Sequence, residues 1–256
     1  MSLNITTLVS IGQHPRSCRE MRADQDARAI ELGLTLSPVE LTLVHAGTAQ
    51  SPALRMYLGM GLQTLKVIRQ TEQADIIPAL VSWLQQSDSH IILTGVRAER
   101  GEASGLVPYL ISEQLGWPLI SHIVAIEMTS QTEARILQAL PHGQRRAISV
   151  KLPFIATVDS SAPKPRQSAF GPGQRAIIDI LDSKEVVDTS RLPWKQSTAR
   201  KRPKRLKIVK AETAAERFRA ATAKSQSNNG KTLQSESADQ KAHAILRILT
   251  EEGVLK

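Results

Sequence analysis

The sequence predicts an α/β fold, in which a mostly parallel sheet is flanked by helices and extended by an antiparallel hairpin and a C-terminal arm. Three observations predict it. Short apolar runs alternate with helical stretches through residues 1–125, strand-like segments then follow one another directly, and 41% of the 256 residues are apolar although only 3% are aromatic. Strands that alternate with helices need crossover connections, which place parallel strands in one sheet covered on both faces.

The alternating part begins near the N-terminus. We expect strands at Ile5–Ile11, Val39–Val44, Leu65–Ile68 and His90–Leu93, and helices at Asp24–Leu36, Ser51–Met60, Asp75–Gln86 and Leu106–Leu115. Pro52 and Pro78 fall in the opening turns of the second and third helices, where a missing amide costs little.

The antiparallel addition occupies residues 119–158. Its expected strands are Leu119–Glu127, Glu133–Leu140, Arg145–Leu152 and Pro153–Val158. The second and third of these are joined by Pro141-His142-Gly143-Gln144, which is typical of a hairpin turn.

Beyond residue 160 the regular patterns weaken. We expect helices at Ala211–Ala223 and Ala238–Leu249, and the second has an apolar face that must pack on its own domain or on a partner. The sequence KSQSNNGKTLQSES between them has the composition of a linker. The expected divisions are an α/β domain at 1–182, a loop and basic segment at 183–223, the linker at 224–237 and a C-terminal amphipathic helix at 238–256.

Composition limits the classes of protein. The N-terminus MSLNITTLVS has no basic region before its short apolar segment, and no apolar run reaches the length of a membrane span. We therefore expect no signal peptide and no transmembrane helix, which indicates a cytoplasmic location. The single Cys18 excludes an internal disulfide framework and a multi-cysteine metal site.

The net charge of +9 belongs mainly to one segment. Residues 191–224 contain twelve Lys and Arg against two Glu, a local balance of +10. Two interpretations stay open, a solvated or nucleic-acid-binding tail and a surface that docks on an acidic protein. Only Trp194 and Phe218 are interleaved with the charge, so we expect no nucleic-acid partner.

The sequence GVRAERGEASG, residues 95–105, is the candidate ligand loop. It follows an expected strand of a parallel sheet, and α/β proteins bind ligands at the carboxyl ends of such strands. The first amides of the next helix have no partner within the helix and can bind a phosphate. Ser104 offers a hydroxyl, and Gly101 and Gly105 permit close approach. The alternative is that Ser104 only caps the helix.

The sequence does not contain common catalytic motifs. There is no Walker sequence, Gly59-Met60-Gly61 lacks the third glycine of a dinucleotide fingerprint, and GEASG does not have the spacing of a nucleophile elbow. The six histidines are scattered, and Glu99 and Glu102 are interpreted as solvated loop carboxylates. We expect no catalytic residue and no metal site.

Several segments together resemble the beta subunits of electron transfer flavoproteins. They are ADQDARAIELGL (23–34), LVHAGTAQSPALRMYLGMGLQTLKVI (43–68), ILTGVRAERGEASGLVPYLISEQLGWP (92–118), KLPFIATVD (151–159), APKPRQSAFGPGQRAI (162–177) and ILRILTEEGVLK (245–256). The chain departs from the family pattern at Gln63, which replaces an acid, at Leu106, which replaces a glutamine, and at the insertion Ala103. The hairpin keeps only Gly143, and residues 224–237 are an addition.

The resemblance implies a fold of the adenine-nucleotide-binding type and a heterodimer. The alpha subunit would carry a redox-active FAD, and this chain would hold AMP, or a second FAD if the protein is electron-bifurcating. Electrons would come from flavoprotein dehydrogenases and pass to a membrane quinone oxidoreductase or another acceptor. The chain would be an electron carrier subunit and not an enzyme, because the chemistry resides in the flavin. A stand-alone module that binds adenine nucleotides or RNA is the remaining alternative.

The same resemblance implies the site residues. The cofactor-binding residues would be Ser10, Asp26, Ala46, Glu102, Ser104, Gly105, Leu106 and Val107. Small side chains at Ser10 and Ala46 suit an adenine that lies against the backbone, although ordinary tight packing at strand ends would favour them as well.

A partner-binding loop is implied at SKEVVDTSRLP, residues 183–193. The partner-binding residues would be Val186, Val187, Leu192, Arg200, Lys201 and Arg202. The apolar ones would anchor a dehydrogenase, with a covered edge strand as the alternative interpretation. The basic ones would steer acidic partners through a salt-sensitive contact.

Overall fold

The computed structural model describes residues 3–36, 39–191, 193–195, 197–199, 213–222 and 236–251. They belong to two compact units, Met1–Lys195 and Gln196–Lys256, and we describe each by itself. The finer division into four segments stays a prediction.

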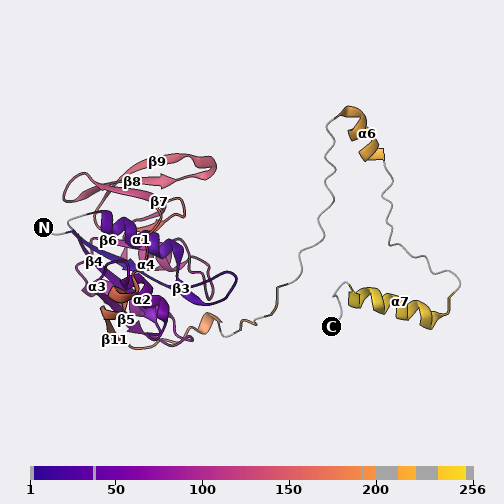
Figure 1. Cartoon of the computed structure of the whole chain (residues 1–256), viewed down its shortest axis with the longest axis horizontal. Helices are drawn as coiled ribbons and strands as arrows, with labels where there is room; N and C mark the ends of the chain where they lie inside the picture. The colour runs from indigo at the N-terminus through magenta and orange to yellow at the C-terminus, as the bar shows by residue number, and fades with distance from the viewer. Residues whose placement is uncertain are drawn as a thin grey trace. The chain divides into compact units, whose positions relative to one another are not determined.

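A nine-stranded sheet forms the first unit, with order β11-β5-β4-β1-β6-β10-β7-β8-β9. Strands β8 and β9 lie at one end of it and β5 and β11 at the other (Figure 1). The strands are β1 Leu3–Leu8, β4 Val39–Gly47, β5 Thr64–Arg69, β6 Ile91–Gly95, β7 Leu119–Met128, β8 Glu133–Ala139, β9 Arg145–Lys151, β10 Phe154–Val158 and β11 Ile177–Asp182. Every neighbouring pair from β11 to β7 is parallel, whereas β7-β8 and β8-β9 are antiparallel. The predicted α/β class with its hairpin addition is confirmed. The expected strand Pro153–Val158 does not belong to the antiparallel addition, because β10 pairs in parallel with β6 and β7.

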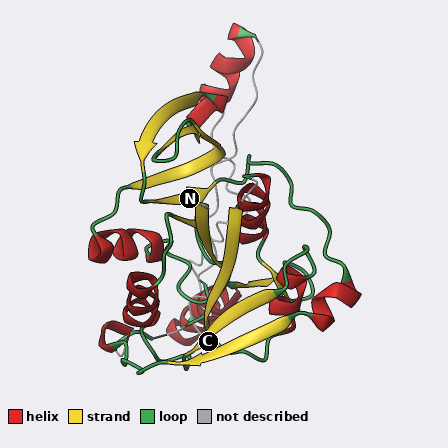
Figure 2. Ribbon diagram, turned by 90° about the vertical axis from the view of Figure 1, so that its left-hand side faces the viewer, coloured by secondary structure: helices red, strands yellow, loops and turns green. Residues whose placement is uncertain are grey.

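Helices cover both faces of this sheet (Figure 2). They are α1 Asp24–Thr35 and α2 Pro52–Leu58 on one face, and α3 Ile76–Gln86 and α4 Val107–Leu115 on the other. Successive strand residues point to opposite faces, so Leu43 of β4 packs with α1 and α2, while the next residue, Val44, packs with α3. Burial on both faces explains why these strands are nearly continuous apolar runs in the sequence.

The sequence did not predict every element. The small antiparallel sheet of β2 Ile11–Gln13 and β3 Glu20–Arg22 was missed, as were helix α5 Phe170–Arg175 and strand β11. The expected strand Ile5–Ile11 is wrong at its end, because β1 stops at Leu8 and Ile11 already belongs to β2. Three-residue strands carry no periodicity, and β11 becomes a strand because it pairs with the edge of β5.

The second unit contains helices α6 Ala214–Thr222 and α7 Ala238–Glu251, close to the predicted ranges. Helix α7 exposes Ile245, Leu246 and Ile248, each more than half accessible. Packing of this apolar face on a partner stays a prediction. None of the helices in the described part of the chain has the length and hydropathy needed to cross a membrane.

Candidate functional site

The order of the strands switches direction at β1. This strand pairs with β4 on one side and with β6 on the other, so connections leave it in both directions. A switch of this kind opens a crevice beyond the carboxyl ends of the strands, where open α/β sheets bind ligands. Ser10 follows β1 at this position, and Gly95 ends β6.

Asp26, in the first turn of α1, connects these two strand ends. Its Oδ2 accepts hydrogen bonds from the Ser10 amide at 2.7 Å and the Ser10 hydroxyl at 2.6 Å, and its Oδ1 accepts one from the Gly95 amide at 3.0 Å. The neighbouring Gln25 accepts a hydrogen bond from the Val96 amide at 3.0 Å. Two residues of the expected cofactor site therefore come together, and both carboxylate oxygens of Asp26 are engaged by the protein itself.

The environment of Asp26 is apolar enough to change its acidity. The residue is 4% exposed, and this burial raises the pKa of its carboxyl group to about 6, although the hydrogen bonds from Ser10 and Gly95 act to lower it. Tyr57 stabilises the same end of β1 and the start of α1. Its buried hydroxyl accepts a hydrogen bond from the Ala23 amide at 2.7 Å and donates one to the Ser10 carbonyl at 2.8 Å.

The N-terminus of α1 is capped by a distant side chain. Its N-cap residue, Ala23, makes no side-chain capping bond, and Glu99 accepts hydrogen bonds from the Asp24 amide at 3.1 Å and the Gln13 amide at 3.0 Å. A carboxylate is stabilised there by the unpaired amides and the helix dipole. The interpretation of Glu99 as a merely solvated carboxylate is therefore wrong.

The N-terminus of α4 carries no such carboxylate. Its first turn has no acidic residue, and its N-cap residue, Leu106, makes no side-chain capping bond. Gly105 has a left-handed φ of 77° and Leu106 is right-handed, an alternation that forms the concave runs of amides that bind anions. The exposed Ser104 accepts a hydrogen bond from the Leu106 amide at 3.3 Å. The amides of Gly105 and Val107 make no hydrogen bond to the described residues.

Ala46 lies near the end of β4, two residues after Val44, which pairs with Leu8 at the end of β1. Two buried polar side chains flank it. His45 donates from Nδ1 to the Val9 carbonyl at 2.8 Å, which leaves its Nε2 an acceptor without a partner in the described chain. Gln70, just after β5, likewise has no described partner for either polar atom of its amide. Unpaired buried groups are costly, so these strand ends suit a polar ligand.

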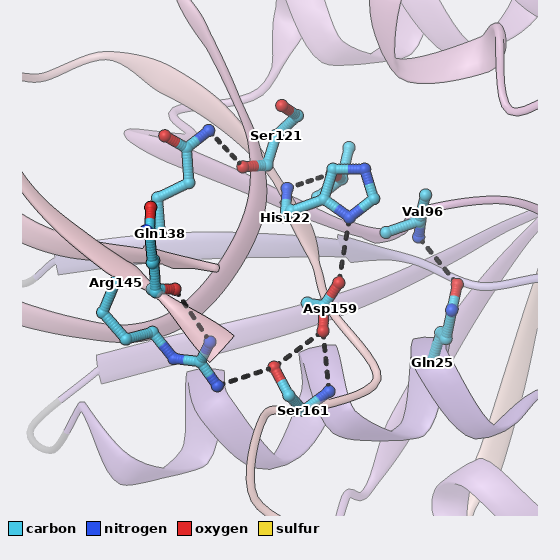
Figure 3. A network of polar contacts seen from close by, with 10 residues as sticks. Gln25, Val96, Ser121, His122, Gln138, Arg145, Asp159 and Ser161 are labelled. Atoms are coloured by element: carbon cyan, nitrogen blue, oxygen red, sulfur yellow. Dashed lines mark hydrogen bonds and ion pairs between the residues drawn. The ribbon is translucent and has the colours of Figure 1, made fainter. Parts of the chain in front are cut away.

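The antiparallel addition is fastened to the same edge of the sheet (Figure 3). His122 of β7 contacts Asp159, which follows β10, with Nδ1 and Oδ2 2.9 Å apart. The Ser161 hydroxyl donates to Asp159 Oδ1 at 2.7 Å, and Arg145 of β9 donates to that hydroxyl at 3.3 Å. Because the carboxylate and not the imidazole contacts the serine, this group lacks the geometry of an activated nucleophile.

The expected partner loop is only partly described. Val186 and Val187 are 43% and 57% exposed. Backbone contacts hold them beside the start of α3, since the Val186 carbonyl accepts a hydrogen bond from the Asp75 amide at 2.7 Å and Val187 bridges to Ala74. The other expected partner residues, Leu192, Arg200, Lys201 and Arg202, lie outside the described residues.

The remaining expected site residue, Glu102, is exposed in the loop before α4. Reasoning from sequence missed Gln25, Tyr57 and the capping role of Glu99. The pair Asp24 and Asp26 at the start of a helix is a local signal that could have drawn attention to α1. The partners of Glu99 are 75 and 86 positions away, so no local pattern could reveal them. No cluster of potential metal ligands occurs within the described ranges.

Two comparisons with known proteins add to this picture. Residues 22–185 match the family described as the electron transfer flavoprotein domain. A curated protein of Chromohalobacter salexigens, named electron transfer flavoprotein subunit beta, is 48% identical over 258 residues, and the alignment covers 100% of this chain and 97% of that protein.

Proposed function

The chain belongs to the electron transfer flavoprotein beta subunit family, and from that premise we propose that it pairs with an alpha subunit and relays electrons through an FAD held by that partner. The full-length similarity to a protein named subunit beta carries this proposal. The flavin supplies the redox chemistry, and this chain supplies binding, orientation and docking.

The nucleotide of this chain is proposed to be AMP. Its phosphate would lie at the start of α4, where Gly105 and Val107 offer amides and the first turn has no acidic residue. Ser104 would add its hydroxyl, which the Leu106 amide orients by donating a hydrogen bond to it. Its base would extend toward the ends of β1 and β4. Glu102 can only accept hydrogen bonds when ionised, which suits ribose hydroxyls.

Each strand-end residue has a distinct part in this proposal. Ser10 and Ala46 leave room for the base, because both side chains are small. Asp26 acts indirectly, since its carboxylate already binds Ser10 and Gly95 and holds their strand ends together. The acceptor of His45 and the amide of Gln70, which have no partner in the described parts of the chain, support a polar group of the ligand at this end.

The partners are proposed from the exposed and charged segments. Val186, Val187 and Leu192 would anchor flavoprotein dehydrogenases, and Arg200, Lys201 and Arg202 would steer acidic ones toward the cytoplasmic carrier. A membrane quinone oxidoreductase would be one acceptor. Because the valines are fixed by backbone bonds and still exposed, they can contact a partner without unfolding the loop.

Purification of the native protein tests the proposal. We expect a second chain of the alpha type to accompany this one, with one FAD and one AMP released from each pair. Two FAD molecules for each pair would show the bifurcating form. A chain that remains single, binds no flavin partner and binds RNA would contradict the proposal.

A further inference from the structure

The loop between β6 and α4, residues 96–106, is attached firmly at its two ends. At the first end, Asp26 and Gln25 accept hydrogen bonds from Gly95 and Val96. At the other end the chain enters α4. Between these ends, in residues 97–105, the hydrogen bonds to other described parts of the chain come from Glu99 and Arg100 alone.

Arg100 binds the small sheet of β2 and β3. Its Nη1 lies 2.6 Å from Oε1 of Glu20, the first residue of β3. The other oxygen of Glu20 accepts a hydrogen bond from the hydroxyl of Ser51, the N-cap residue of α2, at 2.7 Å. The hydrogen bonds from Ser51 and Arg100 lower the pKa of Glu20, so its carboxylate stays ionised at neutral pH.

Glu99 makes the second attachment, and the backbone at Gly12 leaves space for its carboxylate. Its carboxylate bridges the Gln13 amide of β2 and the Asp24 amide of α1. A Cβ on Gly12 would lie 2.6 Å from Oε2 of Glu99 and 2.7 Å from the backbone of Ala23. Only glycine at position 12 leaves room for this carboxylate.

We propose that Glu99 and Arg100 are positioning residues that hold the β6–α4 loop closed over the bound adenine nucleotide, so that the β2–β3 hairpin controls how fast the nucleotide leaves. The inference rests on the proposed AMP site at the start of α4. Ser104 and Gly105 lie on the same loop, a few residues beyond both attachments. Loss of one attachment leaves the stretch with Ser104 and Gly105 held by the other attachment alone, because no other hydrogen bond to the rest of the described chain holds its middle.

The test measures release of AMP from the assembled two-subunit protein, loaded with radiolabelled AMP and chased with unlabelled AMP. Arg100→Glu places two carboxylates together at Glu20, and we expect release about fivefold faster than in the native protein, since an exposed ion pair contributes up to about 1 kcal/mol. The double variant Glu20→Arg with Arg100→Glu restores the pair with reversed charges and should return the rate to within about twofold of the native one.

Arg97→Glu is the matched control. It makes the same change of charge in the same loop, at an exposed residue for which the described structure shows no ion pair. We expect its release rate to equal that of the native protein. Equal rates for Arg97→Glu and Arg100→Glu, or a double variant that stays fast, would overturn the inference while leaving the AMP site intact. An assembled protein that retains no labelled AMP at all would overturn the proposed site and the inference together.

Discussion

The N-termini of α1 and α4 lie at the same edge of the sheet but differ in charge. The first turn of α1 contains Asp24 and Asp26, and Glu99 caps its amides. The first turn of α4 contains no acid. Both ends offer the same backbone donors and the same favourable dipole, so the helix alone does not define an anion site. Under the proposed function, the carboxylates decide which end would receive a phosphate.

The difference in charge also indicates different roles for the two helix ends. At α1 the chain supplies its own anions, and Asp26 ties two strand ends together. At α4 the amides of Gly105 and Val107 have no partner among the described residues, and the left-handed Gly105 lets the backbone turn tightly before the helix. One end therefore stabilises the fold, and the other end is the proposed place of the nucleotide.

The largest expected difference between the two helix ends is a pH-dependent contribution to stability at α1. Asp26 keeps its proton up to about pH 6 in the folded chain, whereas in the unfolded chain it loses the proton near its ordinary pKa of 3.8. The folded state binds more protons between these values, so the contribution of Asp26 to the free energy of unfolding falls as pH rises through this window, by about 3 kcal/mol. The α4 end has no acid in its first turn to add to this effect.

Denaturant unfolding of the full-length chain and of Asp26→Asn, at a series of pH values from 4 to 7, measures this contribution. The stability of the native chain relative to Asp26→Asn should decrease across that range. A constant difference between the two would show that Asp26 titrates normally in the folded state.

The next effect concerns the Asp26 carboxylate, which joins the ends of β1 and β6 like a staple by binding Ser10 and Gly95. Asp26→Ala leaves the amides of Ser10 and Gly95 without an acceptor, which is offset in part because an ionised group is no longer buried. At pH 7.5 we expect a net loss of about 2 kcal/mol in the free energy of unfolding. Asp24→Ala, two positions earlier in α1, removes an ion pair with Arg28 in which the Asp24 side chain is 56% and the Arg28 side chain 12% exposed. Arg28 keeps its hydrogen bond to the Ala162 carbonyl, so the loss should be less than about 1 kcal/mol. Similar losses for the two variants would contradict the staple.

The smallest expected effect is on AMP affinity at the α4 end. Gly101 and Gly105 have similar left-handed φ values of 72° and 77°, so alanine is strained at both. A Cβ at Gly105 would lie 2.7 Å from the Val96 carbonyl oxygen, whereas a Cβ at Gly101 meets nothing within 4 Å. We expect Gly105→Ala to weaken AMP binding by the assembled protein about tenfold relative to Gly101→Ala, equivalent to about 1.4 kcal/mol. Calorimetry on both variants measures it, and equal affinities would place the phosphate elsewhere.

Much of the fold follows from local patterns. The alternation of apolar strands and amphipathic helices predicts the parallel sheet. The turn residues at 141–144 predict the β8–β9 hairpin, and the pairing of Ala139 with Arg145 across that turn confirms it. The α/β class and the family resemblance also predicted that the ligand site lies at the carboxyl edge of the sheet, near Ser10 and Ser104. Strand β11 and the β2–β3 hairpin escaped prediction, since their pairing partners and not their own residues make them strands.

The sequence by itself determined the class of fold, the edge at which a ligand is expected and the family, because apolar periodicity, turn residues and motif order act over short stretches of chain. Only the tertiary structure decided that Glu99 caps α1, that Asp26 joins β1 to β6 and that Arg100 reaches Glu20. These contacts join residues between 16 and 80 positions apart. Hydrogen bonds and charges act across a few ångströms of space, so a pattern along the chain cannot reveal them until the sheet has brought its strand ends together.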